Sequence, residues 1–355
     1  MVLVLTNEDM ERIQDLPISA IIAAMESAYR ELGEGVAQSP PRRRLILQAP
    51  GADSTYWFNN IMGAAPGACT MALRVDSSFF RVLEVGGARR KVREGAFIGL
   101  VLLFDVGTGE LLAIMHDHYL STRRVAATGA LGARFLARKD SKVMGLFGTG
   151  HQATTQVLAM AEVRPLQLVK VFSPNPEHRR EFAARMDGEV DCEVRAVDEP
   201  HDVVEGADIV VTATNSRTPV FDGRWLTSGT HLETIVGTDQ SAAGSEIDRE
   251  VVRRANVIVT SLKEQIQVDR QPKLLWAIEE GLLTWEQIHD LGEVVAGRAP
   301  GRMSREQITL HDNNTGMGIQ FAALGALVLD RARQQRLGTV LPDALFSTRG
   351  GDYAP

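Results

Sequence analysis

The sequence predicts an α/β protein that combines a Rossmann-type, doubly wound parallel sheet with a second, discontinuous α+β domain. From residue 142 onward, apolar runs of strand length alternate with helical segments, which is typical of a parallel sheet with helices on both faces. In the first third of the chain, one helix is followed by several strands joined by short turns, which favours an antiparallel sheet there.

The parallel region begins with a long helix that we expect to be capped by Ser121 or Thr122 and to end at Ala137. Its many alanines and glycines imply close packing against a neighbouring element. The strands expected after it cover residues 143–147, 168–172, 190–197, 208–214, 231–236 and 257–260. The helices expected there cover residues 153–161, 177–186, 201–205, 247–254, 274–280 and 284–295, and a short strand follows at 308–311.

The remaining elements are assigned to the other domain. Apolar residues at three- and four-residue steps predict a helix over residues 17–32, and strands are expected over 42–47, 56–62, 70–75, 97–104 and 110–115. A last helix over 319–336 has an apolar face that needs a partner, so we expect it to return to this first domain. The predicted domains are therefore residues 1–120 with 315–355, and residues 121–314.

The amino-acid composition narrows the classes of protein to which this chain can belong. The 355 residues are 44% hydrophobic and 23% charged, as in an ordinary soluble globular protein of two domains. A net charge of −7 argues against a nucleic-acid partner. Two cysteines, Cys69 and Cys192, are too few for a disulfide framework and favour a reducing compartment, so we expect a cytoplasmic protein. The short apolar start at residues 2–5 is neither a signal peptide nor a membrane span, and no membrane partner is expected.

A glycine turn lies at the start of the parallel region. Residues 142–153, K-V-M-G-L-F-G-T-G-H-Q-A, join an apolar strand to a helix through Gly148, Thr149 and Gly150. This arrangement presents backbone N–H groups and a helix N-terminus to a pyrophosphate. Glycine turns join many strands to helices, so the prediction of NAD or NADP binding depends on the alternating strands and helices around this one.

The end of the second parallel strand slightly favours NADP over NAD. A fold selective for NAD usually has Asp or Glu there to bind the ribose hydroxyls, whereas this chain has Ser173 and Asn175. His178, Arg179 and Arg180 follow, and a basic side chain would suit a 2′-phosphate. Ordinary surface charges on a helix are the alternative explanation.

Arginines enter the first strand of the other domain. On a strand, Arg42 and Arg44 share one face and Arg43 takes the other. A solvated sheet edge explains such a run without any function.

Four stretches resemble the ornithine cyclodeaminase/mu-crystallin family. They are L-L-A-I-M-H-D-H-Y-L-S-T-R-R-V-A-A at 111–127, G-L-F-G-T-G-H-Q-A at 145–153, the run from A-D-I-V-V-T-A-T-N to T-I-V-G at 207–237, and L-G-E-V-V-A-G at 291–297. Their order and spacing extend through most of the chain. The resemblance implies a homodimer with one Rossmann domain and one domain for substrate binding and dimerisation.

The resemblance also implies an enzyme that binds NAD or NADP and exchanges hydride at the α-carbon of an amino or imino acid. A ketimine or imino acid reductase or an amino acid dehydrogenase is the leading interpretation. An ornithine or lysine cyclodeaminase that uses NAD catalytically is one alternative. A protein that binds the nucleotide and a small ligand without turnover is another.

Residue roles follow from the same resemblance. Arg42, Arg44 and Arg124 would bind the substrate carboxylate, because the arginine fork suits a bidentate contact. Asp239 would bind the substrate amine and transfer protons, although a capping aspartate in a turn is the alternative. The residues expected to contact the cofactor are Thr122, Gly148, Thr149, Gly150, His151, Gln152, Ser173, Asn175, Arg179, Thr212, Ala213, Thr214, Val236 and Gly237.

Two positions depart from the family pattern. Arg74 aligns with an active-site lysine, and arginine can bind a carboxylate but effectively cannot act as a base. This weakens the cyclodeaminase alternative, whereas simple hydride transfer is less affected. The second departure is His116-Asp117-His118, where relatives tend to have Asp-Gly-Asn. His118 could replace an acid/base group or be a polar residue near the cofactor; a metal site lacks a third ligand, so no metal is expected.

Overall fold

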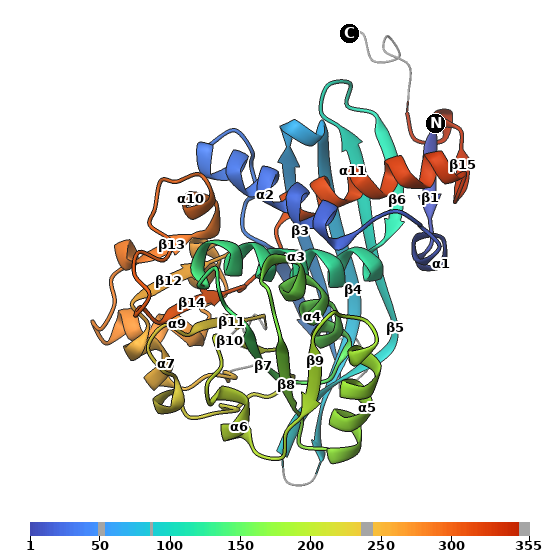
Figure 1. Ribbon diagram of the computed structural model, residues 1–355. Coiled ribbons are helices and arrows are strands. Elements are labelled where there is room, and N and C mark those ends of the chain that lie inside the picture. The colour runs from blue at the N-terminus through green and yellow to red at the C-terminus, as the bar shows by residue number, and fades with distance from the viewer. Residues whose placement is uncertain (49–53, 86–87, 236–243, 348–355) are drawn as a thin grey trace. The chain divides into compact units, whose positions relative to one another are not determined.

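The structure is a computed structural model that describes residues 1–48, 54–85, 88–235 and 244–347, without the side chains of residues 82–93 (Figure 1). Contacts divide the chain into two compact units. Unit 1 comprises Met1–Leu16, Ala37–Ser121 and Met317–Pro355, and unit 2 comprises Pro17–Val36 and Thr122–Gly316. Residues 17–36 therefore group with the parallel-sheet unit, whereas the sequence predicts that all of residues 1–120 belong to the other domain.

Unit 1 contains a seven-stranded sheet with the strand order β15-β1-β6-β5-β4-β3-β2. The strands are β1 (Val2–Leu5), β2 (Arg43–Gln48), β3 (Thr55–Ala65), β4 (Thr70–Val85), β5 (Ala88–Asp105), β6 (Leu111–His116) and β15 (Thr339–Leu341). Neighbouring strands are antiparallel except β1 and β6, which are parallel. The predicted antiparallel sheet is confirmed. β4 and β5 are longer than expected because they pair with each other as far as Val85 and Ala88.

Helix α11 (Gly318–Gln335) covers one face of this sheet (Figure 1). Its Phe321 and Leu324 are fully buried, and the Thr70 hydroxyl of β4 donates to the Ala322 carbonyl over 3.0 Å. The apolar face of this helix therefore has the partner that its pattern required. A short helix, α1 (Asn7–Glu11), and the 3₁₀ turns η1 (Pro66–Ala68) and η5 (Asp343–Leu345) complete the regular structure described in this unit.

Unit 2 is the predicted doubly wound fold. All neighbouring strands of its eight-stranded sheet are parallel, in the order β13-β12-β14-β11-β10-β7-β8-β9. The strands are β7 (Val143–Phe147), β8 (Leu168–Phe172), β9 (Glu193–Ala196), β10 (Ile209–Thr212), β11 (His231–Thr234), β12 (Val257–Thr260), β13 (Ile288–Asp290) and β14 (Thr309–Asp312).

Helices cover both faces of this sheet. Ile209 and Val211 of β10 belong to one buried hydrophobic cluster, and Val210 between them belongs to another, so each face carries its own core. The helices are α2 (Ile18–Glu34), α4 (His151–Val163), α5 (Pro176–Asp187), α6 (Pro200–Val204), α7 (Arg249–Arg254), α8 (Lys263–Val268), α9 (Pro272–Glu279) and α10 (Leu291–Val295). Helix α2 packs against α10 and α4, which explains why it groups with this unit.

Helix α3 (Asp117–Leu136) starts four residues earlier than the predicted cap at Ser121. The prediction was wrong because the acceptor for a first-turn N–H comes from far away in the sequence. The Tyr119 N–H donates to the Asn7 Oδ1 atom over 3.1 Å. The helix packs closely, as its composition implied, with Ala126, Ala127 and Ala130 fully buried.

The predicted helix over residues 284–295 is also wrong. This segment holds a 3₁₀ turn, η4 (Trp285–Gln287), then strand β13 and helix α10. Pairing of β13 with β12 outweighs the local helical pattern. Among the described residues, no helix is both long and apolar enough to cross a membrane.

Candidate functional site

The glycine turn of unit 2 is locked between its neighbouring strands. Gly148 has a φ of +106°, and a Cβ there would lie less than 3.0 Å from the Ala213 carbonyl, so only glycine fits without strain. The Gly148 N–H donates to the Phe172 carbonyl over 2.9 Å, and the Ala213 N–H donates to the Phe147 carbonyl over 2.8 Å. The ends of β7, β8 and β10 therefore fix this turn.

The N-terminus of α4 has the properties of an anion site. Gly150 is the residue before its first turn and makes no side-chain cap, and a Cβ built on Gly150 meets no atom within 4 Å. Gly150 thus offers no side-chain acceptor to the first-turn N–H groups and lies beside open space, as pyrophosphate binding requires. His151 and Gln152 begin this helix, and within the described residues the buried Gln152 Oε1 atom has no partner. These residues fit a dinucleotide.

A buried glutamate that the sequence analysis missed holds the end of β10. Glu246 is 1% exposed and accepts hydrogen bonds from the Thr214 N–H over 2.7 Å and from the Thr214 hydroxyl over 2.6 Å. The Thr212 hydroxyl donates to its other oxygen over 3.3 Å. Burial raises the pKa of Glu246. Glu246 thus shapes the strand end where Thr212, Ala213 and Thr214 were predicted to contact the cofactor.

A buried ion pair joins the carboxyl ends of β11 and β14. The Lys273 Nζ atom lies 2.7 Å from the Asp312 Oδ1 atom and 3.0 Å from the Thr234 hydroxyl. The lysine and aspartate side chains are each only 2% exposed. Ligands bind at this edge of a doubly wound sheet. Loss of one partner would leave a buried unpaired charge, which typically costs about 3–5 kcal/mol.

Near the end of β8, the Arg179 side chain is held by neighbouring residues. Its guanidinium donates to the Ser173 carbonyl over 3.0 Å and pairs with Asp198 at 2.5 Å, and its side chain is 8% exposed. Asn175 caps α5 by accepting from the backbone N–H groups of Glu177 and His178. Ser173 and Asn175 thus lie at the predicted strand end, whereas Arg179 is buried below it.

Arg124 and Thr122 lie on α3 within unit 2. Thr122 is buried, and the guanidinium nitrogens of Arg124 would be 3.1 Å from a Cβ at Gly316. The segment after β14 therefore passes directly over this guanidinium. Val236, Gly237 and Asp239 lie outside the described residues.

In unit 1, the side chains of Arg42, Arg43 and Arg44 alternate in solvent exposure, as expected for a strand. Arg43 is exposed, whereas Arg42 and Arg44 are half-buried. The Arg44 Nε donates to the Asn59 Oδ1 atom over 2.9 Å, and the Asn59 Nδ2 donates to the Asp76 Oδ1 atom over 2.7 Å. Asn59, which the sequence analysis did not single out, therefore links Arg44 to Asp76.

Arg74 lies between two buried carboxylates. Its Nε donates to the Asp117 Oδ2 atom over 2.9 Å, its Nη2 also binds Asp117, and its Nη1 pairs with Asp76. Asp76 is 5% exposed and Asp117 is 1% exposed. Arg74 and Asp117, which the sequence analysis singled out separately, therefore meet in one ion pair.

The histidines beside Asp117 do not gather around one point with it. The His118 N–H donates to the His116 Nδ1 atom over 3.2 Å, and the Asp117 carboxylate is turned to Arg74. This arrangement does not resemble a metal site.

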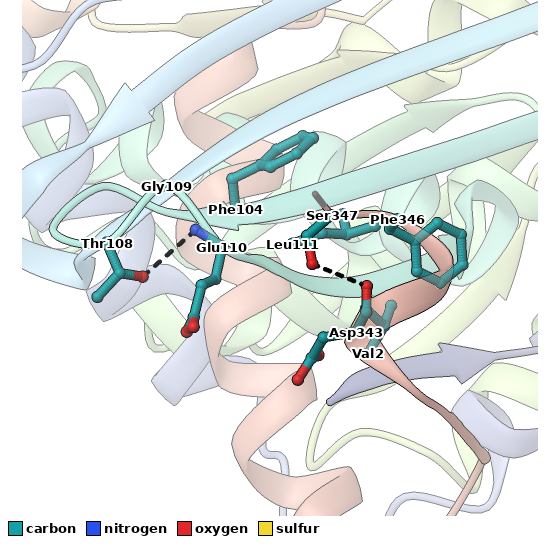
Figure 2. A pocket seen from close by; sticks show the side chains of 9 residues that line it. All are labelled: Val2, Phe104, Thr108, Gly109, Glu110, Leu111, Asp343, Phe346 and Ser347. Carbon is teal, nitrogen blue, oxygen red and sulfur yellow. Dashed lines mark hydrogen bonds between the residues drawn. The ribbon is translucent and has the colours of Figure 1, made fainter. Parts of the chain in front are cut away.

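One cavity of unit 1 is lined by residues that are not among the predicted site residues (Figure 2). It has a volume of about 440 Å³. Its lining is Val2, Phe104, Thr108, Gly109, Glu110, Leu111, Asp343, Phe346 and Ser347. Of its two carboxylates, Asp343 is paired with the Met1 amino group, and Glu110 would repel the carboxylate of an amino acid, so we do not assign the substrate to this cavity.

The fold and the turn at Gly148 define the class of protein. Unit 2 has the fold of a dinucleotide-binding domain, and the chain is an enzyme of the NAD(P)-binding α/β class. The chain belongs to the ornithine cyclodeaminase/mu-crystallin family, whose model matches residues 3–336.

The chain is also similar in sequence and structure to several dehydrogenases and reductases. A putative dehydrogenase of Rhizobium meliloti is 33% identical over 338 residues, covering 95% of this chain and 97% of that protein. Thermococcus litoralis Δ1-pyrroline-2-carboxylate reductase, solved with NADH and L-proline, is 28% identical with a TM-score of 0.81, covering 96% and 100% of the two chains. An archaeal alanine dehydrogenase dimer with bound NAD is 26% identical with a TM-score of 0.77, covering 96% and 99%.

The proposed anion site can be tested by filling the open space at Gly150 with a methyl group. We expect Gly150→Ala to raise the Kd for NADH or NADPH by about tenfold or more, because its methyl group would occupy the space that the phosphate needs. The melting temperature should fall by only a few degrees, since the φ of −80° suits alanine and losing a good cap residue typically costs about 1 kcal/mol. Titration calorimetry and thermal unfolding measure the two effects.

Gly188→Ala is the matched control, because the nearest atom to its Cβ is 4.0 Å away and it lies at the end of α5. A Kd for Gly150→Ala within twofold of wild type would contradict the assigned site.

Proposed function

We propose that this chain is an NAD(P)-dependent reductase or dehydrogenase that transfers hydride at the α-carbon of an α-imino or α-amino acid. The observation that carries this proposal is the fixed glycine turn followed by the uncapped N-terminus of α4, because it fits a dinucleotide pyrophosphate. The similar proteins support the substrate class, since they include a reductase of a cyclic imino acid and an amino acid dehydrogenase.

The cofactor, when bound, supplies or accepts the hydride at its nicotinamide ring. Gly148, Thr149 and Gly150 would hold the pyrophosphate through backbone N–H groups. Glu246 would fix the backbone of Thr212 to Thr214 in the shape that the cofactor contacts. We assign Ser173 and Asn175 to the adenosine ribose.

The arginines would recognise the substrate carboxylate. A planar guanidinium binds a carboxylate through two parallel N–H donors, and Arg42, Arg44 and Arg124 are the candidates. Asn59 would help to orient Arg44, because it accepts from the Arg44 Nε.

The proton-transfer role would fall to Asp239. Arg74 is paired with two carboxylates, and an arginine guanidinium does not act as a base in proteins. Position 74 therefore cannot supply the lysine-type step of a cyclodeaminase. This favours hydride transfer over the cyclodeaminase alternative, and it leaves Arg74 as a permanent hydrogen-bond donor.

The slight preference for NADP stays a prediction. The guanidinium of Arg179 is engaged by Ser173 and Asp198, so the preference now rests on His178 and Arg180, which are exposed. We also place the enzyme in the cytoplasm, because its two cysteines are free thiols that suit a reducing compartment.

We further propose a homodimer formed through the sheet face of unit 1 opposite α11. Alternation along the strands places an apolar set on this face, with Met62, Leu73 and Leu102 in register. Exposed members are Leu45 at 60%, Leu47 at 59%, Ile98 at 53%, Met62 at 45% and Phe79 at 41%. An apolar face of this kind marks a protein interface, and the similar alanine dehydrogenase is a dimer.

The function is tested by cofactor oxidation. Purified protein is mixed with NADH or NADPH and a panel of cyclic imines, including Δ1-pyrroline-2-carboxylate, and of α-keto acids with ammonia. We expect absorbance at the reduced-nicotinamide band to fall with at least one substrate. Arg124→Lys should raise the KM for that substrate by about tenfold or more, since lysine cannot make the bidentate contact, and leave the KM for the cofactor within twofold.

Arg134→Lys, an exposed arginine on the same helix, is the control. No oxidation of either cofactor across the panel would overturn the proposal. Ammonia release from ornithine or lysine without net cofactor change would establish the cyclodeaminase instead.

The dimer is tested by analytical ultracentrifugation. We expect wild type to sediment at twice the mass of one chain and Met62→Glu to sediment as a monomer, because a charge would be buried at the centre of the apolar face. Met303→Glu, at a methionine that is 75% exposed in unit 2, should stay dimeric. A dimeric Met62→Glu variant would place the interface elsewhere.

A further inference from the structure

The environment of Arg74 points to a role for a residue without an assigned function. We propose that Asp117 is a positioning residue that holds the Arg74 guanidinium in one orientation for the substrate, and that Gly99 provides the space for Asp117. The expected effect on substrate KM rests on the proposed function. The fixed orientation of the Arg74 guanidinium can be tested without turnover.

Arg74 is held at both ends of its guanidinium. The Nε and Nη2 atoms both donate to the Asp117 Oδ2 atom, and Nη1 pairs with Asp76 on the other side. A group anchored to two separate carboxylates cannot rotate about its Cδ–Nε or Nε–Cζ bond without breaking one of these pairs. Of its five N–H donors, three serve these carboxylates, and within the described residues two are left for a ligand.

Asp117 in turn depends on Gly99. A Cβ at residue 99 would lie less than 3.0 Å from both carboxylate oxygens and the Cγ atom of Asp117. Gly99 is in register with Asp76, so it lies directly across from the second carboxylate that holds Arg74. Any side chain at residue 99 would therefore displace the Asp117 carboxylate from its present position.

Charge explains why orientation is the main contribution of Arg74. The formal charges of Asp76, Arg74 and Asp117 sum to −1, and the two carboxylates are almost fully buried. The positive charge of the guanidinium is already balanced, so it adds little net attraction for a substrate carboxylate. Its contribution to binding is the direction of its two remaining N–H groups, which is lost if the guanidinium can turn.

The first experiment compares Asp117→Asn and Gly99→Ala with wild type on the substrate that the panel identifies. We expect both variants to raise the KM for that substrate by about tenfold or more and to change kcat by less than about threefold. The Kd for the cofactor should stay within twofold, because the cofactor residues lie in unit 2. Asp15→Asn, at an exposed aspartate of unit 1, is the control.

A double-mutant cycle separates the proposed contact from a general loss of packing. In an Asp117→Gly background, Gly99→Ala should change KM by less than about twofold, because the carboxylate that it displaces is gone. An unchanged effect of Gly99→Ala in that background would overturn the role of Gly99. A KM for Asp117→Asn equal to that of wild type would overturn the role of Asp117.

A measurement without turnover keeps this inference separate from the proposed function. The ¹⁵N–¹H spectrum of the Arg74 guanidinium, assigned by its loss in Arg74→Lys, should show resolved Nη signals in wild type because rotation is blocked. In Asp117→Asn these signals should merge, at an unchanged cofactor Kd. Merged signals in wild type would overturn the inference, whereas an inactive wild type with resolved signals would overturn only the function.

Discussion

The close approach of the Gly148 turn to the end of β10 is the constraint on which the proposed cofactor site depends. A side chain at this position would collide with the Ala213 carbonyl, and the positive φ excludes most other residues on conformational grounds. This contact brings the start of α4 to the carboxyl ends of β7 and β10. The first-turn N–H groups then lie where a doubly wound sheet binds its ligand.

Buried charges support the edge that this turn creates. Glu246 fixes the end of β10, and the Lys273–Asp312 pair joins the ends of β11 and β14. In unit 1, Asp76 and Asp117 hold Arg74 in the same way. Buried charges are costly unless they are paired, so removing one partner of any of these ion pairs would be strongly destabilising. In the proposed function, each pair would preorganise the atoms of its own unit without having to contact the ligand.

Much of the fold could be predicted because its signals are local. The turn at Gly148, the alternating parallel strands and the apolar period of α2 each lie within one short stretch. The start of α3 could not be predicted, since its acceptor Asn7 is 112 residues from Tyr119. Glu246, Asp312 and Asp117 lie 32, 39 and 43 residues from their partners Thr214, Lys273 and Arg74, so no local pattern reveals these three contacts. Arginine and aspartate were visible at positions 74 and 117, but only the sheet brings them together.

The central claim, hydride transfer at the α-carbon, is tested most directly with a cofactor that carries deuterium at the nicotinamide C4. The reduced cofactor is incubated with the imino acid that the enzyme consumes, and the product amino acid is examined by mass spectrometry and NMR. We predict one deuterium at the α-carbon of each product molecule when the label is on the transferred face. A product whose α-hydrogen comes from solvent, with the label kept in the nicotinamide for both C4 epimers, would contradict the account.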